Sequence, residues 1–421
     1  MSESMVEIEG GRSLNGEVSL SGAKNAALPL LVAACLTDEP IVLENVPIGL
    51  NDVKVMIELL QAMGAEIHQE GNSTIICSRG TLQGGEVPAE LANKIRYSLL
   101  LLGFFAGLRQ EVYLSHPGGC NIGDRKYDLH LMGLQKLGAS IEETETSITL
   151  KSKGLEGTLI DFYLPTTSGT ENIMIAASLA KGTTILRNAN TRPEVQQLGN
   201  LLRQMGAKVK VQSRVVEITG VDKLRGGFRF SIMPGWDEAV TYIAAAGITR
   251  GEVVILDFDL DHIPEEARYL REAGLELFQW QRNVYVSGKR VGRPFDLFTA
   301  PYPGVNSDMQ PIFAALALTI PGTSTITDLR FTDRFQYVEE LKHFGANIES
   351  FGNTAIVTGG GHLIGAEVKA TDIRGGMACV MVGLAAKGIT RIANVYQIER
   401  GYENFVEKFT ALGAEIRRIE R

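Results

Sequence analysis

The stretch LLQAMGAEI (59–67) decides the fold, because close copies of it return five times along the chain. Each copy ends a helical pattern at a glycine and leads into a β-prone run. The glycines are Gly64, Gly138, Gly206, Gly274, Gly345 and Gly413, at intervals of 74, 68, 68, 71 and 68 residues. Glycine at this place fits a helix end, where the chain turns through a left-handed conformation before a strand. Six repeated units of about 70 residues are therefore predicted to fill the chain.

Each unit also contains an Ala- and Leu-rich segment that is apolar nearly all round, which is typical of a helix buried inside a domain. The segments are NAALPLLVAACL (25–36), RYSLLLLGFFAGL (96–108), TENIMIAASLAKG (170–182), AVTYIAAAGITRG (239–251), DMQPIFAALALTIPG (308–322) and RGGMACVMVGLAAKG (374–388). Polar residues stand near their starts, namely Lys24, Asn25, Arg96, Thr170, Glu171, Glu238, Asp308, Asp372 and Arg374. Helix N-termini present free N–H groups that attract anions. We predict two domains of three units each, with these helix starts facing a shared, anion-binding cleft.

Composition narrows the class of protein. The chain has 421 residues, 44% of them hydrophobic, and a net charge of -8, which argues against a general nucleic-acid-binding protein. Four cysteines without a CxxC pair and six histidines without metal spacing predict no disulfide framework, no metal site and a reducing, cytoplasmic location. The N-terminus lacks the apolar core of a signal peptide, and the apolar runs are shorter than the roughly 20 residues of a membrane helix. No membrane association or obligate protein partner is expected.

The segment HPGGCNIGDRKYDLHL (116–131) carries the most specific chemistry. Pro117, Gly118 and Gly119 predict a flexible loop with Cys120 at the tip. Arg125 and Lys126 follow closely, and a nearby cation lowers the pKa of a thiol and makes it reactive. The other cysteines, Cys35, Cys77 and Cys379, lie in apolar helices or a β-rich run and are expected to be buried and inert.

Cations recur at equivalent places in the units, each at the start of a buried helix or in the loop after a central strand. They are Lys24, Arg96, Arg125, Arg334, Arg374 and Arg400. Arginine forks match phosphate and carboxylate geometry, so this set predicts a small substrate that carries both groups. Asp308 stands at the start of a buried helix. Its carboxylate either interacts with the helix dipole or acts as a general base or hydroxyl-positioning group, and Asp372 has the same ambiguity.

These residues form motifs that resemble the UDP-N-acetylglucosamine 1-carboxyvinyltransferase family of enolpyruvyl transferases over essentially the full chain. The motifs are SGAKNAALP (21–29), PGGCNIGDR (117–125), DLHL (128–131), TENIM (170–174), SDMQ (307–310), DRF (333–335), TDIR (371–374) and ERGYE (399–403). The related transferase that acts on shikimate 3-phosphate shares the architecture but has no PGGC loop, so it is the weaker match.

The resemblance implies a two-domain inside-out α/β barrel of six βαβαββ repeats, three per domain. One domain would span 24–233 and carry the Cys120 loop. The other would combine 1–23 with 234–421, and the active site would lie in the cleft between them.

The implied reaction moves the enolpyruvyl group of phosphoenolpyruvate to the 3-hydroxyl of UDP-N-acetylglucosamine, with release of phosphate, as the first committed step of peptidoglycan synthesis. It passes through a tetrahedral intermediate and needs no metal or organic cofactor. The implied catalytic residues are Cys120 as proton donor, Asp308 as base, and Lys24 and Arg400 on the phosphate. The implied substrate-binding residues are Lys24, Asn25, Arg96, Arg125, Lys126, Tyr127, Asp128, Leu129, Thr167, Ser168, Asp308, Arg330, Arg334, Asp372, Arg374 and Arg400.

The chain departs from the family pattern mainly on the nucleotide side. The departures are residues 124–127, residues 166–169, Pro234-Gly235-Trp236-Asp237-Glu238 in place of a common PDRIE, Arg330 in place of an apolar residue, and Gln397 in place of a His. Lys126 would add a phosphate contact and Tyr127 would stack on a base, or both are surface substitutions. The acceptor therefore stays open: a sister transferase that modifies another nucleotide or nucleotide sugar is the alternative, and a catalytically silent binding protein on the same scaffold is a third.

Overall fold

The computed structural model describes residues 4–118, 126–332 and 334–420. Within them the chain divides into two compact units. The N/C unit comprises residues 4–21 and 234–420, and the central unit comprises residues 22–118 and 126–233. None of the helices in the described part of the chain has the length and apolar character needed to cross a membrane.

The central unit contains three four-stranded sheets. In each, the first strand runs parallel to the second, and the remaining neighbours are antiparallel. In spatial order the sheets are β14 (Arg229–Ser231), β3 (Ile41–Glu44), β5 (Thr74–Ser78) and β4 (Glu66–Glu70); β6 (Gly85–Glu86), β7 (Val112–Ser115), β9 (Ser147–Lys151) and β8 (Ser140–Glu143); and β10 (Leu159–Asp161), β11 (Thr183–Arg187), β13 (Val215–Thr219) and β12 (Lys208–Gln212).

The N/C unit contains three described sheets with the same pattern of one parallel and two antiparallel pairings. They are β2 (Asn15–Ser19), β15 (Glu252–Leu256), β17 (Asn283–Ser287) and β16 (Glu276–Trp280); β18 (Asp296–Phe298), β19 (Gly322–Thr327), β21 (Thr354–Gly359) and β20 (Asn347–Phe351); and β22 (Glu367–Lys369), β23 (Ile389–Ala393), β1 (Ser4–Glu9) and β24 (Glu415–Glu420).

Distant segments complete both units. In the central unit β14 pairs with β3, with Arg229 opposite Val42. In the N/C unit β1 lies between β23 and β24, and β2 pairs with β15, with Val18 opposite Ile255. The N-terminal strands therefore belong to the same unit as the C-terminal half of the chain.

Apolar helices fill the interior of the central unit. They are α1 (Lys24–Ala34), α4 (Leu100–Gly107) and α6 (Thr167–Ala177), and every residue of α4 is buried. Helices α4 and α6 touch closely, because a Cβ at Gly103 would lie 2.2 Å from Asn172 Oδ1. The other helices of this unit are α2 (Asn51–Ala62), α3 (Ala89–Ala92), η1 (Arg96–Leu99), α5 (Asp128–Lys136) and α7 (Pro193–Gln204).

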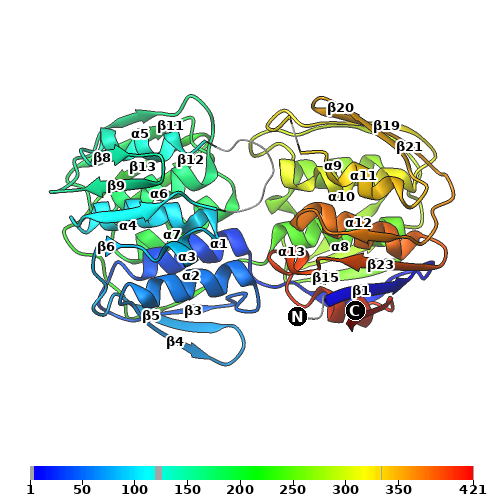
Figure 1. The fold of residues 1–421 in the computed structure, drawn as a ribbon, viewed down its shortest axis with the longest axis horizontal. Helices are drawn as coiled ribbons and strands as arrows, with labels where there is room; N and C mark the ends of the chain where they lie inside the picture. Colours follow the sequence, from blue (N-terminus) through cyan, green and yellow to red (C-terminus); the bar gives the residue numbers. More distant parts are fainter. Residues whose placement is uncertain (1–3, 119–125, 333, 421) are drawn as a thin grey trace. The chain divides into compact units, whose positions relative to one another are not determined.

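The N/C unit has the same construction. Helices α8 (Trp236–Ile248), α10 (Gln310–Leu318) and α12 (Ile373–Ala385) pack against one another in its interior, as Figure 1 shows. Its remaining helices are α9 (Pro264–Glu272), α11 (Tyr337–Lys342), α13 (Tyr396–Glu399), α14 (Phe405–Ala411), η2 (Leu260–His262) and η3 (Ser307–Met309).

The structure confirms the predicted fold class and the repeat. All six repeat glycines have positive φ, with values of 104°, 105°, 111°, 104°, 77° and 92° in chain order. The expectation for the third buried helix was wrong in detail. Helix α6 begins at Thr167, so Thr170 and Glu171 lie beyond its first residues. The cap explains this, because the Thr166 side chain accepts a hydrogen bond from the Gly169 N–H and starts the helix earlier.

Candidate active site

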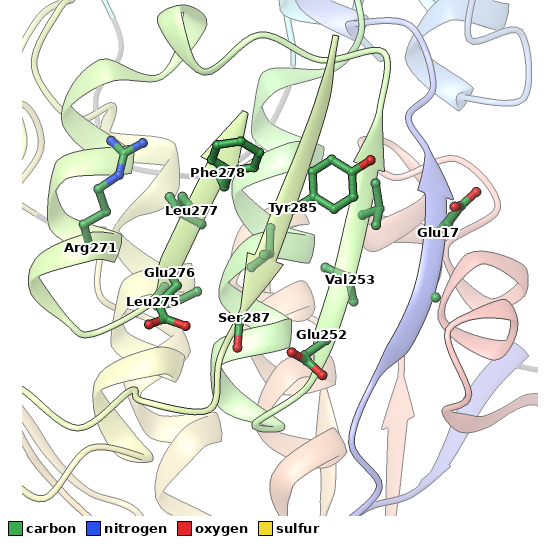
Figure 2. Close-up of a pocket in the computed structure, with 13 residues that line it drawn as sticks. Glu17, Glu252, Val253, Arg271, Leu275, Glu276, Leu277, Phe278, Tyr285 and Ser287 are labelled. Atoms are coloured by element: carbon green, nitrogen blue, oxygen red, sulfur yellow. The ribbon is translucent and has the colours of Figure 1, made fainter. Parts of the chain in front are cut away.

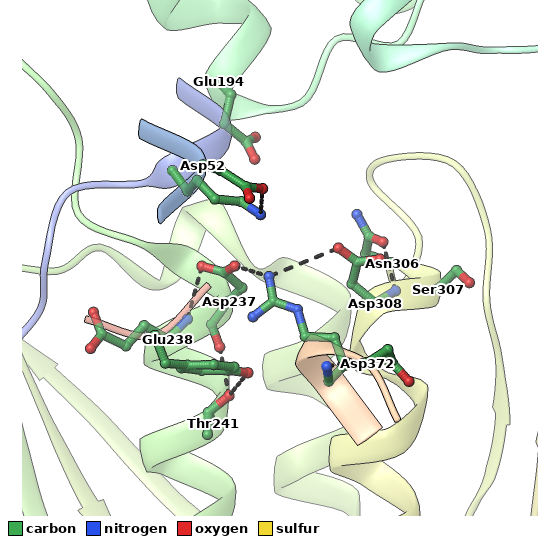
Figure 3. A network of polar contacts seen from close by, with 12 residues as sticks. Asp52, Glu194, Asp237, Glu238, Thr241, Asn306, Ser307, Asp308 and Asp372 are labelled. Atoms are coloured by element: carbon green, nitrogen blue, oxygen red, sulfur yellow. Dashed lines mark hydrogen bonds and ion pairs between the residues drawn. The ribbon is translucent and has the colours of Figure 1, made fainter. Parts of the chain in front are cut away.

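The N/C unit presents a partly exposed carboxylate among buried cations, at the start of a buried helix. Asp308 lies in η3, which runs directly into α10. Its backbone N–H donates to Asn306 Oδ1 at 2.9 Å, so Asn306 caps this turn. The Asp308 side chain is 28% exposed, whereas the arginines beside it are almost completely covered. Figure 3 shows it together with Asn306 and Ser307.

Arg334 holds one oxygen of this carboxylate. Its Nη2 donates to Asp308 Oδ1 at 2.5 Å and its Nη1 donates to Ser307 Oγ at 3.0 Å. Ser307 in turn donates to Asp328 Oδ2 at 2.5 Å, and the Arg334 carbonyl accepts a bond from Gln310 at 3.0 Å. The side chain of Arg334 is only 6% exposed. These bonds fix Asp308 on one side and leave it accessible on the other.

Arg374 brings a second guanidinium to the same carboxylate. It lies in the first turn of α12, where Asp372 Oδ1 accepts from the N–H groups of Arg374 at 2.8 Å and Gly375 at 3.1 Å. Arg374 Nη2 contacts the carboxylate of Asp237 and lies 3.9 Å from Asp308 Oδ2. Burial acts to lower the pKa of Arg374, but the charges of Asp237 and Asp308 raise that pKa well above its ordinary value. Arg374 is therefore a permanent cation, and the observed role of Asp372 is to cap its helix.

Arg400 lies in the segment that follows β23. It is the C-cap of the short helix α13, where its Nη1 donates to Gln397 Oε1 at 3.1 Å. Helix α13 ends at Glu399, the first residue of the ERGYE motif, so this cation lies at a helix end. Arg330 lies exposed after β19, with its guanidinium carbon 5.7 Å from the centre of the Phe331 ring.

The central unit contains an ion pair between Lys24 and Asp52. Lys24 begins α1, and its Nζ lies 3.1 Å from Oδ2 of Asp52, in the first turn of α2. Both side chains are mostly covered, and Asn25 is half-buried in the same turn as Lys24. The sequence analysis did not select Asp52. Its only signal was an acid in the first turn of a helix, which ordinarily serves the helix dipole.

Residues 126–129 lead into α5 and are tied to the central unit. Arg96 Nη2 donates to the Lys126 carbonyl at 2.9 Å. The Tyr127 hydroxyl lies 2.5 Å from His116 Nδ1 and 2.6 Å from Glu143 Oε1. Burial, followed by the contact with Glu143, raises the pKa of Tyr127. The Tyr127 hydroxyl is thus engaged by His116 and Glu143 of the same unit, and stacking of its ring on a base stays a prediction.

The next residues continue this surface. Asp128 Oδ2 accepts a hydrogen bond from Tyr163 at 2.5 Å, and Leu129 is buried. At the start of α6, Thr167 Oγ1 accepts from Asn190 at 3.0 Å, and Ser168 Oγ lies 3.1 Å from Nε2 of His130. These contacts place the predicted nucleotide-side residues on the first turns of α5 and α6.

The cysteines divide as predicted as far as they are described. Cys35, Cys77 and Cys379 are free and buried. The contact with Cys77, followed by burial, raises the pKa of Cys35, and burial raises that of Cys379, so neither thiol is reactive. Cys120 and Arg125 lie outside the described residues. Among the residues that are described, we find no cluster of His, Cys, Asp or Glu suited to a metal ion.

A surface hollow of about 720 Å³ lies over the sheet of β16, β17, β15 and β2. Figure 2 shows Phe278 and Tyr285 along it, with Glu252 and Glu276 at one end. Glu252 is paired with Lys289 at 2.5 Å and Glu276 with Arg290 at 2.9 Å, so these acids are already neutralised. None of the predicted site residues lines this hollow.

Comparison with known proteins shows the family of the chain. The family model described as EPSP synthase (3-phosphoshikimate 1-carboxyvinyltransferase) matches residues 8–409. The chain is 41% identical to UDP-N-acetylglucosamine 1-carboxyvinyltransferase 1 of Carboxydothermus hydrogenoformans, over 98% of this chain and 97% of that protein. It is 42% identical to the protein of the same name from Symbiobacterium thermophilum, over 98% and 94%.

Solved structures agree as well. The enolpyruvyl transferase NikO from Streptomyces tendae superimposes with a TM-score of 0.89 at 25% identity, over 100% of both chains. An EPSP synthase from Acinetobacter baumannii shares the fold, with a TM-score of 0.76 at 17% identity, over 99% of this chain and 100% of that one. Since the family model spans nearly the whole chain and the relatives exceed 40% identity, the chain belongs to the EPSP synthase (3-phosphoshikimate 1-carboxyvinyltransferase) family.

Proposed function

We propose that the protein transfers the enolpyruvyl group of phosphoenolpyruvate to the 3-hydroxyl of UDP-N-acetylglucosamine and releases phosphate, the first committed step of peptidoglycan synthesis. The observation that carries the proposal is the accessible carboxylate of Asp308, held at 2.5 Å by Arg334 and flanked by Arg374. Such a group accepts a proton from a substrate hydroxyl, while the cations beside it attract an anionic co-substrate. The names of the relatives supply the acceptor.

In the proposed reaction an acid protonates the methylene carbon of phosphoenolpyruvate, and C2 becomes electrophilic. Asp308 takes the proton of the sugar 3-hydroxyl as its oxygen bonds to C2, which gives a tetrahedral ketal phosphate. Loss of a proton from the new methyl group and cleavage of the C2–O bond to phosphate then restore the vinyl group. Cys120 is the proposed acid, because a thiol beside cations delivers and accepts protons readily.

The cations have separate proposed tasks. Lys24, Arg125 and Arg400 hold the phosphate, and Arg334 and Arg374 hold the carboxylate. Lys24 already lies against Asp52, which keeps its ammonium in place before the phosphate arrives. Fixed cations lower the barrier, because they need no reorganisation as the electron pair of the C2–O bond leaves with the phosphate. In this proposal residues of both units act on the same pair of substrates.

The proposed acceptor contacts come from the first turns of α5 and α6. The polar residues there are exposed or half-buried, namely Lys126, Tyr127, Asp128, Thr167 and Ser168, and Leu129 is buried beside them. Asn25 and Arg96 lie in the same unit. We place the reaction in the cytoplasm, since three described thiols are free and the cysteine spacing fits a reducing compartment. The chemistry requires no metal and no organic cofactor.

Phosphate release tests the proposal. Purified protein is incubated with phosphoenolpyruvate and UDP-N-acetylglucosamine, and each substrate is omitted in turn as a control. We expect phosphate only when both are present, and a product heavier than the acceptor by the mass of the enolpyruvyl group. A panel of UDP, UMP, UDP-glucose and UDP-N-acetylgalactosamine is run in parallel. Turnover of another nucleotide but not of UDP-N-acetylglucosamine establishes the sister transferase, and no turnover with any acceptor removes the enzymatic proposal.

A further inference from the structure

A second carboxylate competes with Asp308 for Arg374. Asp237, in the first turn of α8, contacts Arg374 Nη2, the same nitrogen that lies 3.9 Å from Asp308 Oδ2. The carboxylates of Asp237 and Asp308, both labelled in Figure 3, lie on α8 and η3, so they approach this guanidinium from different helices.

The simplest role for an acid at this position is service to the helix dipole. Asp237 Oδ1 does accept from the Glu238 N–H at 3.0 Å. Its other oxygen contacts Arg374, and the two side chains are only 9% and 3% exposed. A buried ion pair gains little stability over apolar packing, because both ions lose their hydration. A gain in stability therefore explains this pair poorly, and its effect on Arg374 explains it better.

Competition has a direct consequence for the base. Asp308 already accepts a hydrogen bond from Arg334 at 2.5 Å. If Asp237 were absent, the buried charge of Arg374 would face Asp308 as its nearest carboxylate. Two arginines bound to one carboxylate stabilise its ionised form, and a more stable carboxylate is a weaker base. With Asp237 present, part of the charge of Arg374 is neutralised from the opposite side.

Other groups around Arg374 hold it in this position. The Tyr402 ring lies 4.9 Å from the guanidinium carbon, and its hydroxyl contacts Thr241 of α8 at 2.8 Å. Burial raises the pKa of Tyr402 to about 12, so Tyr402 is neutral. Glu238 also follows in α8, but it is paired with Lys408 at 2.5 Å. Further charged or titratable groups near this cluster, within the described residues, are Asp328, Arg334, Tyr337 and Asp372.

We propose that Asp237 is a positioning residue that holds the guanidinium of Arg374 off Asp308 and so keeps Asp308 an effective base. The inference rests on the proposed function, because it assigns Asp308 the proton of the acceptor hydroxyl. In this role Asp237 sets the rate of proton transfer and the pH at which Asp308 acts as a base. It does not bind the substrates.

The test compares wild-type protein with Asp237→Asn, which keeps the shape and an acceptor oxygen but removes the charge. We expect kcat to fall about tenfold, KM for phosphoenolpyruvate to stay or fall, and the acidic limb of the kcat/KM profile to move to lower pH. Asp237→Glu, which restores the charge, should recover most of kcat. The matched control is Asp257→Asn, which breaks an exposed ion pair with Arg282 in the same unit and should leave the profile unchanged.

An unchanged kcat and acidic limb in Asp237→Asn overturns the inference, as does a rise in KM that accounts for the whole loss. Partial unfolding of the variant does not affect this conclusion. A smaller folded fraction lowers the rate by the same factor at every pH and leaves the pH of the acidic limb unchanged. If Asp237→Asn does not fold, the same profile is measured on the neutral variant Asp237→Ser. There kcat should fall without a rise in KM, and an unchanged kcat overturns the inference. Failure of the proposed function is separate, since wild-type protein would then release no phosphate.

Discussion

His130 should make the central unit sensitive to acid, because its imidazole is buried in a site built for the neutral form. Asn172 Oδ1 accepts the Gly103 N–H at 2.9 Å, which orients its amide so that Nδ2 donates to His130 Nδ1 at 2.9 Å. His130 Nε2 therefore carries the proton and donates to Ser168 Oγ at 3.1 Å. A second proton on Nδ1 would point at another donor. Burial, assisted by the charge of Arg96, lowers the pKa of His130 to about 3.

The sign and size of the pH effect on stability follow from the difference between the folded and unfolded pKa values of His130. The folded pKa of His130 lies below the ordinary value of 6.5, so its contribution to stability is present above pH 6.5 and is lost as the pH falls toward about 3. Protonation of the unfolded chain alone costs about 3 kcal/mol of stability at pH 4.5 and almost none at pH 7.5. Removing the imidazole removes this slope. The stability gap between wild type and His130→Gln should therefore narrow by about 3 kcal/mol from pH 7.5 to pH 4.5.

Urea unfolding of both proteins at half-unit pH steps measures that gap, with fluorescence and circular dichroism followed together to resolve the two units. His343→Gln is the matched control, since His343 is exposed and its removal should leave the slope unchanged. Nuclear magnetic resonance of the labelled imidazole checks the cause directly, because the His130 signal should not titrate above about pH 4. Parallel stability curves for wild type and His130→Gln, or an imidazole that titrates near pH 6.5, would refute the reasoning.

Three further predictions concern the site and its surroundings. Asp308→Asn should lower kcat by about 10²–10⁴-fold in the phosphate-release assay, and a loss below threefold would exclude it as the base. Fosfomycin, an epoxide mimic of phosphoenolpyruvate, should alkylate Cys120 but not buried Cys379 when acceptor is present, and an unmodified Cys120 in the mass spectrum would contradict this prediction. In the phosphate-release assay, Cys120→Ala should lose turnover and Cys120→Asp should retain some. Glu171→Gln should stabilise the protein increasingly above pH 4.5. Burial and the charge of Glu194 raise the pKa of Glu171 well above its ordinary value. Wild-type protein therefore loses stability as the pH rises, and the variant does not. Urea unfolding between pH 5 and pH 8 measures it, and a variant that is never more stable than wild type would contradict it.

The repeat could be predicted because its signals are local. A glycine after an apolar helix needs a positive φ, and the six glycines adopt it, as Gly64 does at 104°. Helices that are apolar on every face have to be interior, and α4 is buried throughout. The start of α6 was misplaced because the sequence signal, the apolar run, begins at Thr170, whereas the Thr166 cap begins the helix at Thr167.

The site was only partly predictable. Asp308 and Arg374 could be selected because charged residues at buried helix starts are unusual, and Arg334 because it follows a central strand. The structure brings the three together. Asp52 escaped selection, since an acid in a first helical turn is ordinary. Tyr127 was expected at the surface or against a base, and nothing near it in the sequence indicates its hydrogen bond with Glu143.

The sequence by itself determined the number of units, the helix ends and the identity of the interior helices, because each depends on residues within a few turns of one another. Only the tertiary structure decided how the sheets close, with β1 inserted between β23 and β24 and β14 placed beside β3. It alone decided that Arg374 contacts Asp237, 137 residues away in the chain. Pairing between residues so far apart in the chain depends on the tertiary packing of the elements. That packing decides which opposite charge lies close enough to pair with a buried one.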